Sequence, residues 1–312
     1  MNQPAKIQKI TIPNNKRVIC ISDIHGELDL FKRLLSKVAF CDDDLLILLG
    51  DLYTKGSQCH ETLKFCIELC SRPNAIALRG NCDWHSDYLS ECEIRWLDNL
   101  PHIIDAGEYV FVHCGLSGNY FSSPESEHYV KYNNFVETAP GFEKWVVVGH
   151  WPVSMYCHGI PCSNPLVCNE KKIIAIDGGN VIKADGQLNA FIINNGQFSF
   201  ESVDNLPAYA VKQSHYESGG KLSITWLDRF VEIVEENGSL CRVKHLATGK
   251  VITVPKSQVL AGAEGQPWCC DLATDYHLPC NAGDEVSVVE AFEDRIFAKA
   301  NGVSGWINEV YK

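Results

Sequence analysis

Three apolar segments in the first part of the chain have the length of buried strands, namely Val18–Ser22, Leu45–Leu49 and Ala75–Leu78. Uninterrupted apolar runs of this length, bounded by turn residues, are typical of central strands in a parallel sheet. The first run is followed at once by Asp23, and the second leads through a glycine to Asp51. Because ligands of open α/β sheets bind at the carboxyl ends of the strands, the pattern predicts a functional site at this edge.

The stretches that alternate with these strands have helical spacing of apolar residues. They are Glu27–Val38, Thr62–Leu69 and approximately Tyr88–Leu97. Apolar residues three and four positions apart form one face of an amphipathic helix. A strand–helix–strand–helix–strand order predicts parallel strand pairing with right-handed crossovers.

After Pro101 the chain holds shorter β segments separated by turn residues. They are His102–Ala106, Tyr109–His113, Trp145–Gly149, Ile173–Asp177, Leu188–Asn194 and Gln197–Val203, and Lys6–Ile12 is expected as an edge strand. A mainly parallel half followed by a mainly antiparallel half predicts two packed sheets with helices outside. The polar and aromatic residues 117–141 between two of these segments are expected to form a surface insertion over the site.

The last third of the chain has short strands, without good helices, behind a polar linker. We predict a first domain over 1–208, a linker over 209–221 and an all-β domain over 222–312. Val231–Glu235 resembles Val286–Glu290 at a spacing of 55 residues, and Lys244 matches Lys299 at the same spacing. This region resembles the small SH3-like barrels found as bacterial appendages, which implies a protein partner. A plain β extension that supports the first domain is the alternative.

Composition and charge place the chain among ordinary globular proteins. Apolar residues make up 46% of the sequence and charged residues 21%, which are typical values. The net charge of −12 argues against nucleic-acid binding, because no excess of cations is available to neutralise phosphates. No apolar run is long enough to cross a membrane, and Met1–Lys6 lacks the core of a signal peptide. We therefore expect a cytoplasmic protein.

The fifteen cysteines do not form a recognisable framework of disulfides. No pair has C-x-x-C spacing, so a zinc site made of thiolates has no support. Many cysteines lie inside apolar runs, where a thiol behaves as a small apolar group. Reduced thiols in a reducing compartment are the expectation.

Six residues that follow apolar β runs are candidate metal ligands: Asp23, His25, Asp51, Asn81, His113 and His150. Each alone is ordinary turn chemistry. Together they point to one site, because four of them have an adjacent glycine, at positions 26, 50, 80 and 149. Glycine permits a tight turn and leaves room for an anion near the metals.

Imidazole, carboxylate and amide oxygen together suit divalent metals of intermediate softness. Two ions about 3.5–4 Å apart need one shared carboxylate, with separate ligands on each ion. We assign one ion to Asp23, His25 and Asp51, and the other to Asp51, Asn81, His113 and His150. A water that bridges such ions ionises near neutral pH and can attack phosphorus in line. The predicted chemistry is metal-assisted phosphoester hydrolysis.

The blocks SDIHGE, GDLYTKGS, RGNCDW, VHCGL, VGHWP and IDGG resemble those of the calcineurin-like metallophosphoesterases. Within this family they are most similar to the bacterial phosphoprotein phosphatases and the diadenosine-tetraphosphate hydrolases. The resemblance covers about Lys16 to Gly179. It implies the same six ligands, a four-layer α-β-β-α sandwich, and two ions, with Mn first and Fe or Zn as alternatives.

The chain departs from the family at the block Gly80-Asn81-Cys82-Asp83, where the family usually has GNHE or GNHD. The resemblance implies catalytic roles for Asp51, Asn81, Cys82 and Asp83. In the family the histidine of this block is the expected general acid, and here the thiol of Cys82 takes its place. Small phosphodiesterases of the superfamily also carry GNCD, which points partly towards diesters. His85 is an alternative proton donor, or only the solvated start of a helix.

A second departure concerns phosphate binding. Lys55 stands where the protein phosphatases have an aspartate–arginine pair, so the bidentate grip on phosphate oxygens is lost. Arg79 is either a second phosphate contact or part of a structural ion pair.

The leading hypothesis is a two-metal phosphomonoesterase of the Ser/Thr type, acting on a phosphorylated protein or a small phosphoester. A phosphodiesterase or dinucleoside polyphosphate hydrolase is the second hypothesis, and a catalytically weak binding module is the third. No G-x-S-x-G elbow, Walker A loop or G-x-G-x-x-G fingerprint occurs.

Overall fold

The computed structural model describes residues 5–116, 132–216, 219–262, 265–269, 272–292 and 295–310. Most of the expected insertion, residues 117–131, lies outside this part of the chain. The contacts divide the chain into two compact units. We call them the N-terminal unit, Met1–Val153 with Asn164–Asn205, and the C-terminal unit, Ser154–Ser163 with Leu206–Lys312.

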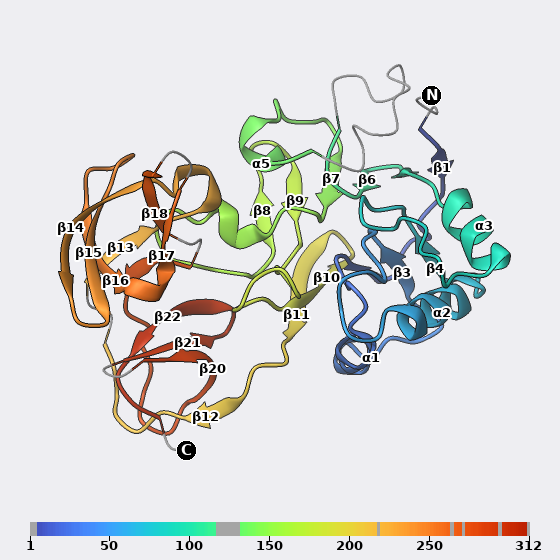
Figure 1. Cartoon of the computed structure of the whole chain (residues 1–312). Coiled ribbons are helices and arrows are strands. Elements are labelled where there is room, and N and C mark those ends of the chain that lie inside the picture. Colours follow the sequence, from blue (N-terminus) through green and yellow to red (C-terminus); the bar gives the residue numbers. More distant parts are fainter. Residues whose placement is uncertain are drawn as a thin grey trace. The chain divides into compact units, whose positions relative to one another are not determined.

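The predicted strand–helix alternation forms one side of the N-terminal unit. The strands are β2 (Val18–Ile21), β3 (Leu45–Leu48) and β4 (Ala75–Ala77), and the helices are α1 (Leu28–Lys37), α2 (Cys59–Cys70) and α3 (Glu91–Asn99). Strand β2 pairs in parallel with β3, and β3 in parallel with β4. Figure 1 shows α1 and α2 beside these strands. The predicted parallel core is confirmed.

Each central strand is buried on both faces. Ile19 and Ile21 of β2 pack with the helices, whereas Val18 and Cys20 point to the opposite side and pack with Phe111 of the second sheet. Alternate residues of a strand point to opposite faces, so a fully apolar run serves two cores at once.

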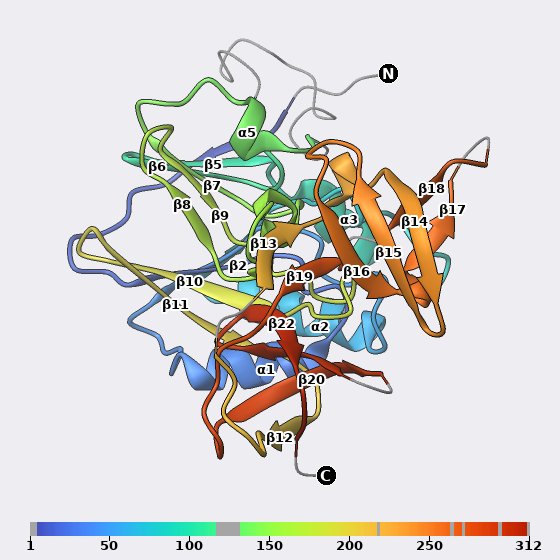
Figure 2. The same cartoon turned by 90° about the vertical axis from the view of Figure 1, so that its left-hand side faces the viewer.

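The second sheet has six strands in the order β1-β5-β6-β7-β9-β8 (Figure 2). Their bounds are β1 (Ile7–Lys9), β5 (Ile103–Ala106), β6 (Tyr109–Val112), β7 (Trp145–Val148), β8 (Leu166–Cys168) and β9 (Ile173–Ala175). Pairs β1–β5, β6–β7 and β7–β9 are parallel, while β5–β6 and β8–β9 are antiparallel. This sheet is therefore mixed, and the mainly antiparallel pairing expected after Pro101 does not extend to all of it.

The two late strands of the unit pair antiparallel, as expected, but they belong to the first sheet. Strands β10 (Leu188–Asn194) and β11 (Gln197–Val203) form an antiparallel hairpin, and β10 pairs with β2 of the first sheet. Sheet membership depends on partners far apart in sequence, which local periodicity does not reveal. In the described residues after β6, the one α-helix is the single-turn α5 (Phe135–Thr138). The α/β class, with a separate all-β region, is confirmed.

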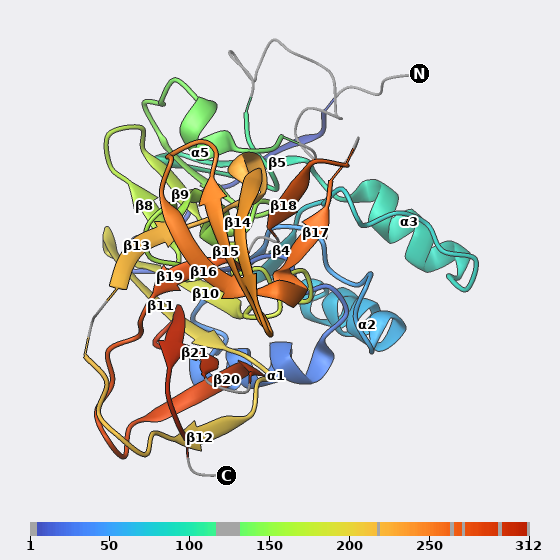
Figure 3. The ribbon, with the colours of Figure 1, turned by 60° about the vertical axis from the view of Figure 1, so that its left-hand side comes forward.

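The C-terminal unit is built from antiparallel strands and short 3₁₀ turns (Figure 3). The strands are β12 (Ala208–Ala210), β13 (Gly219–Ser223), β14 (Val231–Asn237), β15 (Leu240–His245), β16 (Val251–Pro255), β17 (Val259–Ala261), β18 (Pro267–Cys269), β19 (Thr274–Tyr276), β20 (Glu285–Ala291), β21 (Ile296–Ala300) and β22 (Val303–Ile307). The 3₁₀ helices are η1 (Val153–Tyr156), η2 (Trp226–Asp228) and η3 (Lys256–Gln258).

The sequence repeat reappears as a repeat of strand register. In β14–β15, Glu232 lies opposite Lys244, and in β20–β21 the equivalent Ser287 lies opposite Lys299. Each pair of strands is interrupted at the equivalent place, between Ile233 and Glu235 in the first and 288 and 290 in the second. Each copy thus forms its own β ribbon, and the two ribbons have the same register and the same interruption. An SH3-like identity stays a prediction.

The C-terminal unit includes residues that sequence analysis placed elsewhere. Residues 154–163 were expected inside the first domain but belong to the C-terminal unit. The N–H of Ser163 donates to the carbonyl of Gly302 at 2.8 Å. Strand β12, at the start of the expected linker, pairs with β20.

Two further expectations concern helices and thiols. No helix among the described residues is long and apolar enough to cross a membrane. All fourteen cysteines in that part of the chain are free thiols.

Candidate metal centre

The candidate ligands lie at sharp turns directly after the buried strands. Asp23, His25, Asp51 and His150 all have a positive φ, between 50° and 66°. The left-handed region costs a residue with a Cβ about 1–2 kcal/mol. Strained backbone of this kind clusters at functional sites, because the surrounding structure must hold it. Four of the six candidate ligands therefore lie on strained backbone.

The neighbouring glycines make room for the ligands themselves. A Cβ on Gly80 would lie 2.1 Å from Oδ1 of Asp51, and one on Gly149 would lie 2.4 Å from Oδ2 of Asp23. Both distances are far below van der Waals contact. The sequence suggested that glycine keeps space for an anion from solution. In the structure, the space at these two positions is filled by the carboxylates of the chain.

The first group of candidate ligands comprises Asp23, His25 and Asp51, all almost fully buried. Nε2 of His25 lies 3.8 Å from Oδ1 of Asp23 and 3.7 Å from Oδ2 of Asp51. These distances are too long for hydrogen bonds. They suit donor atoms that share one cation, since ligands at about 2 Å from an ion are separated by this amount.

His113 directs one ring nitrogen into a second group. Its Nδ1–H donates to the carbonyl of Leu49 at 2.7 Å, which leaves Nε2 as the unprotonated nitrogen of the neutral ring. Nε2 faces Oδ1 of Asn81 at 3.0 Å and Oδ1 of Asp51 at 3.3 Å. A cation bound among the three atoms would stabilise this arrangement. Burial lowers the pKa of His113, but the charges of Asp51 and Asp23 outweigh burial and raise it, which shows that positive charge is favoured at this place. A buried histidine held in this way is the usual form of a metal ligand.

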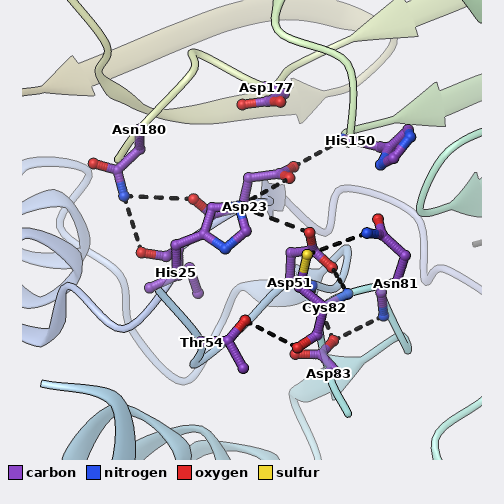
Figure 4. Close-up of polar contacts among 12 residues, drawn as sticks. Asp23, His25, Asp51, Thr54, Asn81, Cys82, Asp83, His150, Asp177 and Asn180 are labelled. Carbon is purple, nitrogen blue, oxygen red and sulfur yellow. Dashed lines mark hydrogen bonds and ion pairs between the residues drawn. The ribbon is translucent and has the colours of Figure 1, made fainter. Parts of the chain in front are cut away.

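His150 completes the cluster through its backbone and its ring. The His150 N–H donates to Oδ2 of Asp23 at 2.9 Å, and its ring lies 5.2 Å from that of His113. Its Nε2 is 2.9 Å from Oδ1 of Asn133. These contacts bring all six candidate ligands together, and Figure 4 shows five of them, Asp23, His25, Asp51, Asn81 and His150.

Buried carboxylates collect around these ligands. Burial, together with the charge of Asp51, raises the pKa of Asp23 and raises that of Asp83 to about 6. Burial and the charge of Asp23 raise the pKa of Asp177 well above its usual range. Such a concentration of buried negative charge is costly unless cations compensate it. The donor set and its charge fit two divalent metal ions.

Asp83 holds the ligand loops together. Its carboxylate accepts hydrogen bonds from the N–H groups of Asp51 at 2.9 Å, Leu52 at 2.8 Å and Gly80 at 2.8 Å. This geometry fixes the turn after β3 against the turn after β4. Asp83 is expected from its sequence block to assist catalysis, and in the structure its oxygens are occupied by backbone.

Cys82 is buried beside Asp51. Its N–H donates to Oδ1 of Asp51 at 2.8 Å, and its carbonyl accepts from Oγ1 of Thr54 at 2.9 Å. Burial and the charge of Asp51 raise the pKa of the thiol to about 12, while Lys55 acts in the opposite direction. Lys55 is exposed and also has a positive φ, of 79°.

Arg79 and His85 are engaged with helix α3. Nη1 of Arg79 donates to Oδ1 of Asp98 at 3.0 Å and to the Leu97 carbonyl at 3.1 Å. Nε2 of His85 lies 2.9 Å from the same oxygen of Asp98. These contacts support the structural alternative for both residues.

Sequence reasoning assigned no role to Asp177 or Asn180, which follow β9. Oδ1 of Asp177 accepts the N–H of Gly179 at 2.7 Å, and Nδ2 of Asn180 donates to the carbonyl of Ile24 at 2.9 Å. The signal was the IDGG block, which has the same apolar-run, Asp and Gly order as the ligand blocks.

A cavity of about 620 Å³ is lined by residues 10–16, 106–109, 193, 195 and 196 together with Val18. None of the candidate ligands lines it.

Residues 16–179, about half of the chain, match the sequence model of the calcineurin-like phosphoesterases. The chain belongs to this family. The match contains all the blocks from SDIHGE to IDGG, so the resemblance seen in the sequence is confirmed at the level of the family.

Two relatives of this calcineurin-like phosphoesterase carry nucleotide-related names. A symmetrical bis(5'-nucleosyl)-tetraphosphatase of Delftia acidovorans (strain DSM 14801 / SPH-1) is 40% identical over 67 residues, which is 21% of this chain and 23% of that protein. The match thus spans about a quarter of the relative's length. A solved structure of a candidate diadenosine tetraphosphatase has 20% identity and a TM-score of 0.51, over 64% of this chain and 99% of the other. This likeness shows the fold.

A metallophosphoesterase from Sphaerobacter thermophilus is also similar in structure. It has 18% identity and a TM-score of 0.43, over 61% of this chain and 89% of that one.

Proposed function

We propose that the protein is a two-metal phosphohydrolase whose active site is the strand-end cluster. One observation carries the proposal: Nε2 of His113 faces only oxygens, from Asn81 and Asp51, at distances that suit a shared cation. The family assignment and the buried carboxylates around Asp51 support it.

Asp23, His25 and Asp51 would hold one ion, and Asp51, Asn81, His113 and His150 the other. When bound, such ions activate a water molecule and neutralise the oxygens of the phosphoryl group. Their identity remains a proposal: the donor set suits Mn, Fe or Zn, of which the sequence favours Mn.

The chain's own residues position the ligands. Asp83 clamps the backbone of Asp51 and Gly80, so that the shared carboxylate keeps its place. The Leu49 carbonyl orients the ring of His113 and fixes its tautomer. Lys55 supplies a positive charge that acts on Cys82 and is suited to attract an anionic substrate.

The substrate proposed first has a leaving group that departs without strong protonation, such as a dinucleoside polyphosphate or an activated diester. Cys82 replaces the histidine that would protonate a poor leaving group, and a thiol is a weaker donor near neutral pH. His85 is engaged with Asp98. The short match to a bis(5'-nucleosyl)-tetraphosphatase points the same way.

A phosphomonoester on Ser or Thr is the second candidate. The presence of all six ligands in one cluster favours it, because the monoesterases of the family use the same metal centre.

The test compares hydrolysis of diadenosine tetraphosphate, an aryl diester and an aryl monoester by the full chain, with added Mn²⁺ or Zn²⁺ and with chelator. Asp51→Asn should lower kcat/KM by at least about a hundredfold, because several kcal/mol of transition-state stabilisation depend on the ions. Asp43→Asn, on the exposed loop before β3, is the matched control.

The preferred substrate decides between the two candidates. Faster turnover of the anhydride or diester supports the first, and faster turnover of the monoester supports the second. Full activity of Asp51→Asn would contradict the metal-centre proposal. Absence of turnover with two ions bound would favour a binding role, in which the C-terminal unit recruits a protein partner.

A further inference from the structure

We propose that the sulfur of Cys82 is itself a metal ligand, on the ion shared with His25 and Asp51. The inference rests on the proposed metal centre and adds to it a residue that the ligand assignment does not include. It also replaces the role of proton donor, which the position of Cys82 in its sequence block suggested.

The geometry of three buried side chains carries the proposal. Sγ of Cys82, one ring nitrogen of His25 and one carboxylate oxygen of Asp51 all lie within 4.8 Å of one another. Three donor atoms bound to one ion at about 2.0–2.3 Å lie roughly 3.3–4.0 Å from one another. The three atoms therefore reach coordination distance when separations of at most 4.8 Å shorten by about 1 Å. Asp23, Asp51 and His113 form a second group by the same criterion, so Asp51 connects the two.

Hydrogen bonds hold the thiol at the site. The Cys82 N–H is bonded to Oδ1 of Asp51, and Nδ2 of Asn81 donates to Sγ at 3.1 Å. Thr54 fixes the carbonyl from the other side. Figure 4 shows the sulfur beside the Asp51 carboxylate and the Asn81 amide. Both partners are candidate ligands, so the residue that positions the shared carboxylate also presents a sulfur to the same centre.

Binding would proceed by exchange of a proton for a metal. The sulfur–metal bond forms as the S–H bond breaks, and the proton goes to solvent. A thiolate is a soft ligand, and it favours Zn²⁺ or Co²⁺ over Mn²⁺. The other ion would keep the harder oxygen and imidazole donors of Asn81, His113 and His150. The two positions would then differ in metal preference, and the leaving group would receive its proton from water.

The test is titration of the metal-free full-length protein with Co²⁺, followed by absorption spectroscopy. A cobalt–thiolate bond gives a charge-transfer band in the near ultraviolet, while ligation by nitrogen and oxygen gives only the visible bands. We expect the ultraviolet band in the wild type, its loss in Cys82→Ser, and its retention in Cys114→Ala. Cys114 is the matched control, because it is a buried thiol next to His113 that lies outside both ligand groups.

A competition titration with Zn²⁺ gives a second readout. Cys82→Ser should weaken the tighter Zn²⁺ site by about tenfold or more, while Mn²⁺ affinity changes less. Cys82→His keeps a donor atom at this place, so it should lose the ultraviolet band and retain Zn²⁺ affinity, which controls for misfolding of the serine variant.

The outcomes separate this inference from the proposed function. Visible cobalt bands without the ultraviolet band, or an ultraviolet band that persists in Cys82→Ser, would overturn sulfur coordination and leave the metal centre intact. No cobalt binding by the wild type would overturn the metal centre, and with it the role of Cys82.

Discussion

Two buried histidines, one in each unit, show how different surroundings give one residue type different roles. His113 and His245 are both completely shielded from solvent. In His245, Nε2 donates to the carbonyl of Asp228 at 2.5 Å and Nδ1 accepts from Oγ1 of Thr248 at 3.0 Å. Both nitrogens of His245 therefore have partners in a neutral ring. In His113 the second nitrogen meets only oxygens that cannot donate.

The difference follows from how each unit buries its strands. In β2 and β3 every position is buried, so polar groups are confined to the strand ends and gather at one edge. In β15 buried and less buried positions alternate, and polar side chains are spread along the strand. The first pattern concentrates charge away from water, where it can bind metals. The second distributes it over a solvated face.

Replacement of each histidine by asparagine sharpens this comparison. His113→Asn should lower metal affinity by about a hundredfold or more, because one ligand of an ion is removed. Calorimetric titration of the full chain with Mn²⁺ and Zn²⁺ measures this change. Unchanged affinity at both positions would contradict the assignment of His113.

Replacement of Gly80 by alanine would disturb the strand-end arrangement without changing any charged residue. We expect Gly80→Ala to lower the free energy of unfolding by about 3 kcal/mol, because the methyl group overlaps Asp51. Urea denaturation in the presence of chelator measures the loss. Gly159→Ala is the control: like Gly80, Gly159 has no positive φ, but a Cβ there would meet nothing closer than 3.7 Å, so stability should change by less than about 1 kcal/mol. Equal losses in both variants would contradict overlap with Asp51 as the cause.

His245→Asn is expected to act on stability and not on metal. The C-terminal unit should lose about 2 kcal/mol, because two buried hydrogen bonds are lost or distorted. Urea denaturation followed by near-ultraviolet circular dichroism measures this loss, and metal titration of the same variant should match the wild type. A fall in metal affinity comparable to that of His113→Asn would erase the distinction between the two histidines.

A smaller effect is expected at the start of α3, where Glu93 has an ordinary structural role. Burial raises its pKa, but hydrogen bonds from Ser90 and the nearby His60 outweigh burial and lower the pKa to about 2. Because the folded pKa lies below the unfolded value of about 4.3, the stabilisation is present above that pH and is lost as pH falls towards 2. Between pH 6 and pH 3 the wild type should lose about 1 kcal/mol more than Glu93→Gln, measured by urea denaturation. Parallel losses would show that Glu93 does not titrate with folding.

Sequence alone was sufficient for the features that depend on local pattern. The apolar runs before Asp23 and Asp51 located the strands, and the residue types after them selected candidate ligands that the structure places in one cluster. Helix α1 was expected over Glu27–Val38 and spans Leu28–Lys37, because its apolar spacing and its packing agree.

Features set by distant partners were beyond reach. The pairing of β10 with β2 and the place of 154–163 in the C-terminal unit depend on residues far away in sequence. The contacts of Asp83 could not be predicted either, because its partners are backbone N–H groups, which are the same for nearly every residue type. For the same reason Arg79 could be either a phosphate ligand or a structural residue until Asp98 was seen beside it.

Residues 154–163 belong to the C-terminal unit although they lie in sequence between two parts of the N-terminal unit. This has a consequence for how the protein is synthesised. These residues leave the ribosome before the last strands of the N-terminal unit, yet one of their hydrogen-bond partners is Gly302. At about 5–20 residues per second, roughly 7–28 s pass before that partner is synthesised. During this time β8 to β11 are synthesised, and the Gly302 carbonyl is still missing. A chain that ends prematurely near residue 208 would never contain Gly302. We expect chaperones or proteases to recognise such a product, because residues 154–163 could not form this hydrogen bond.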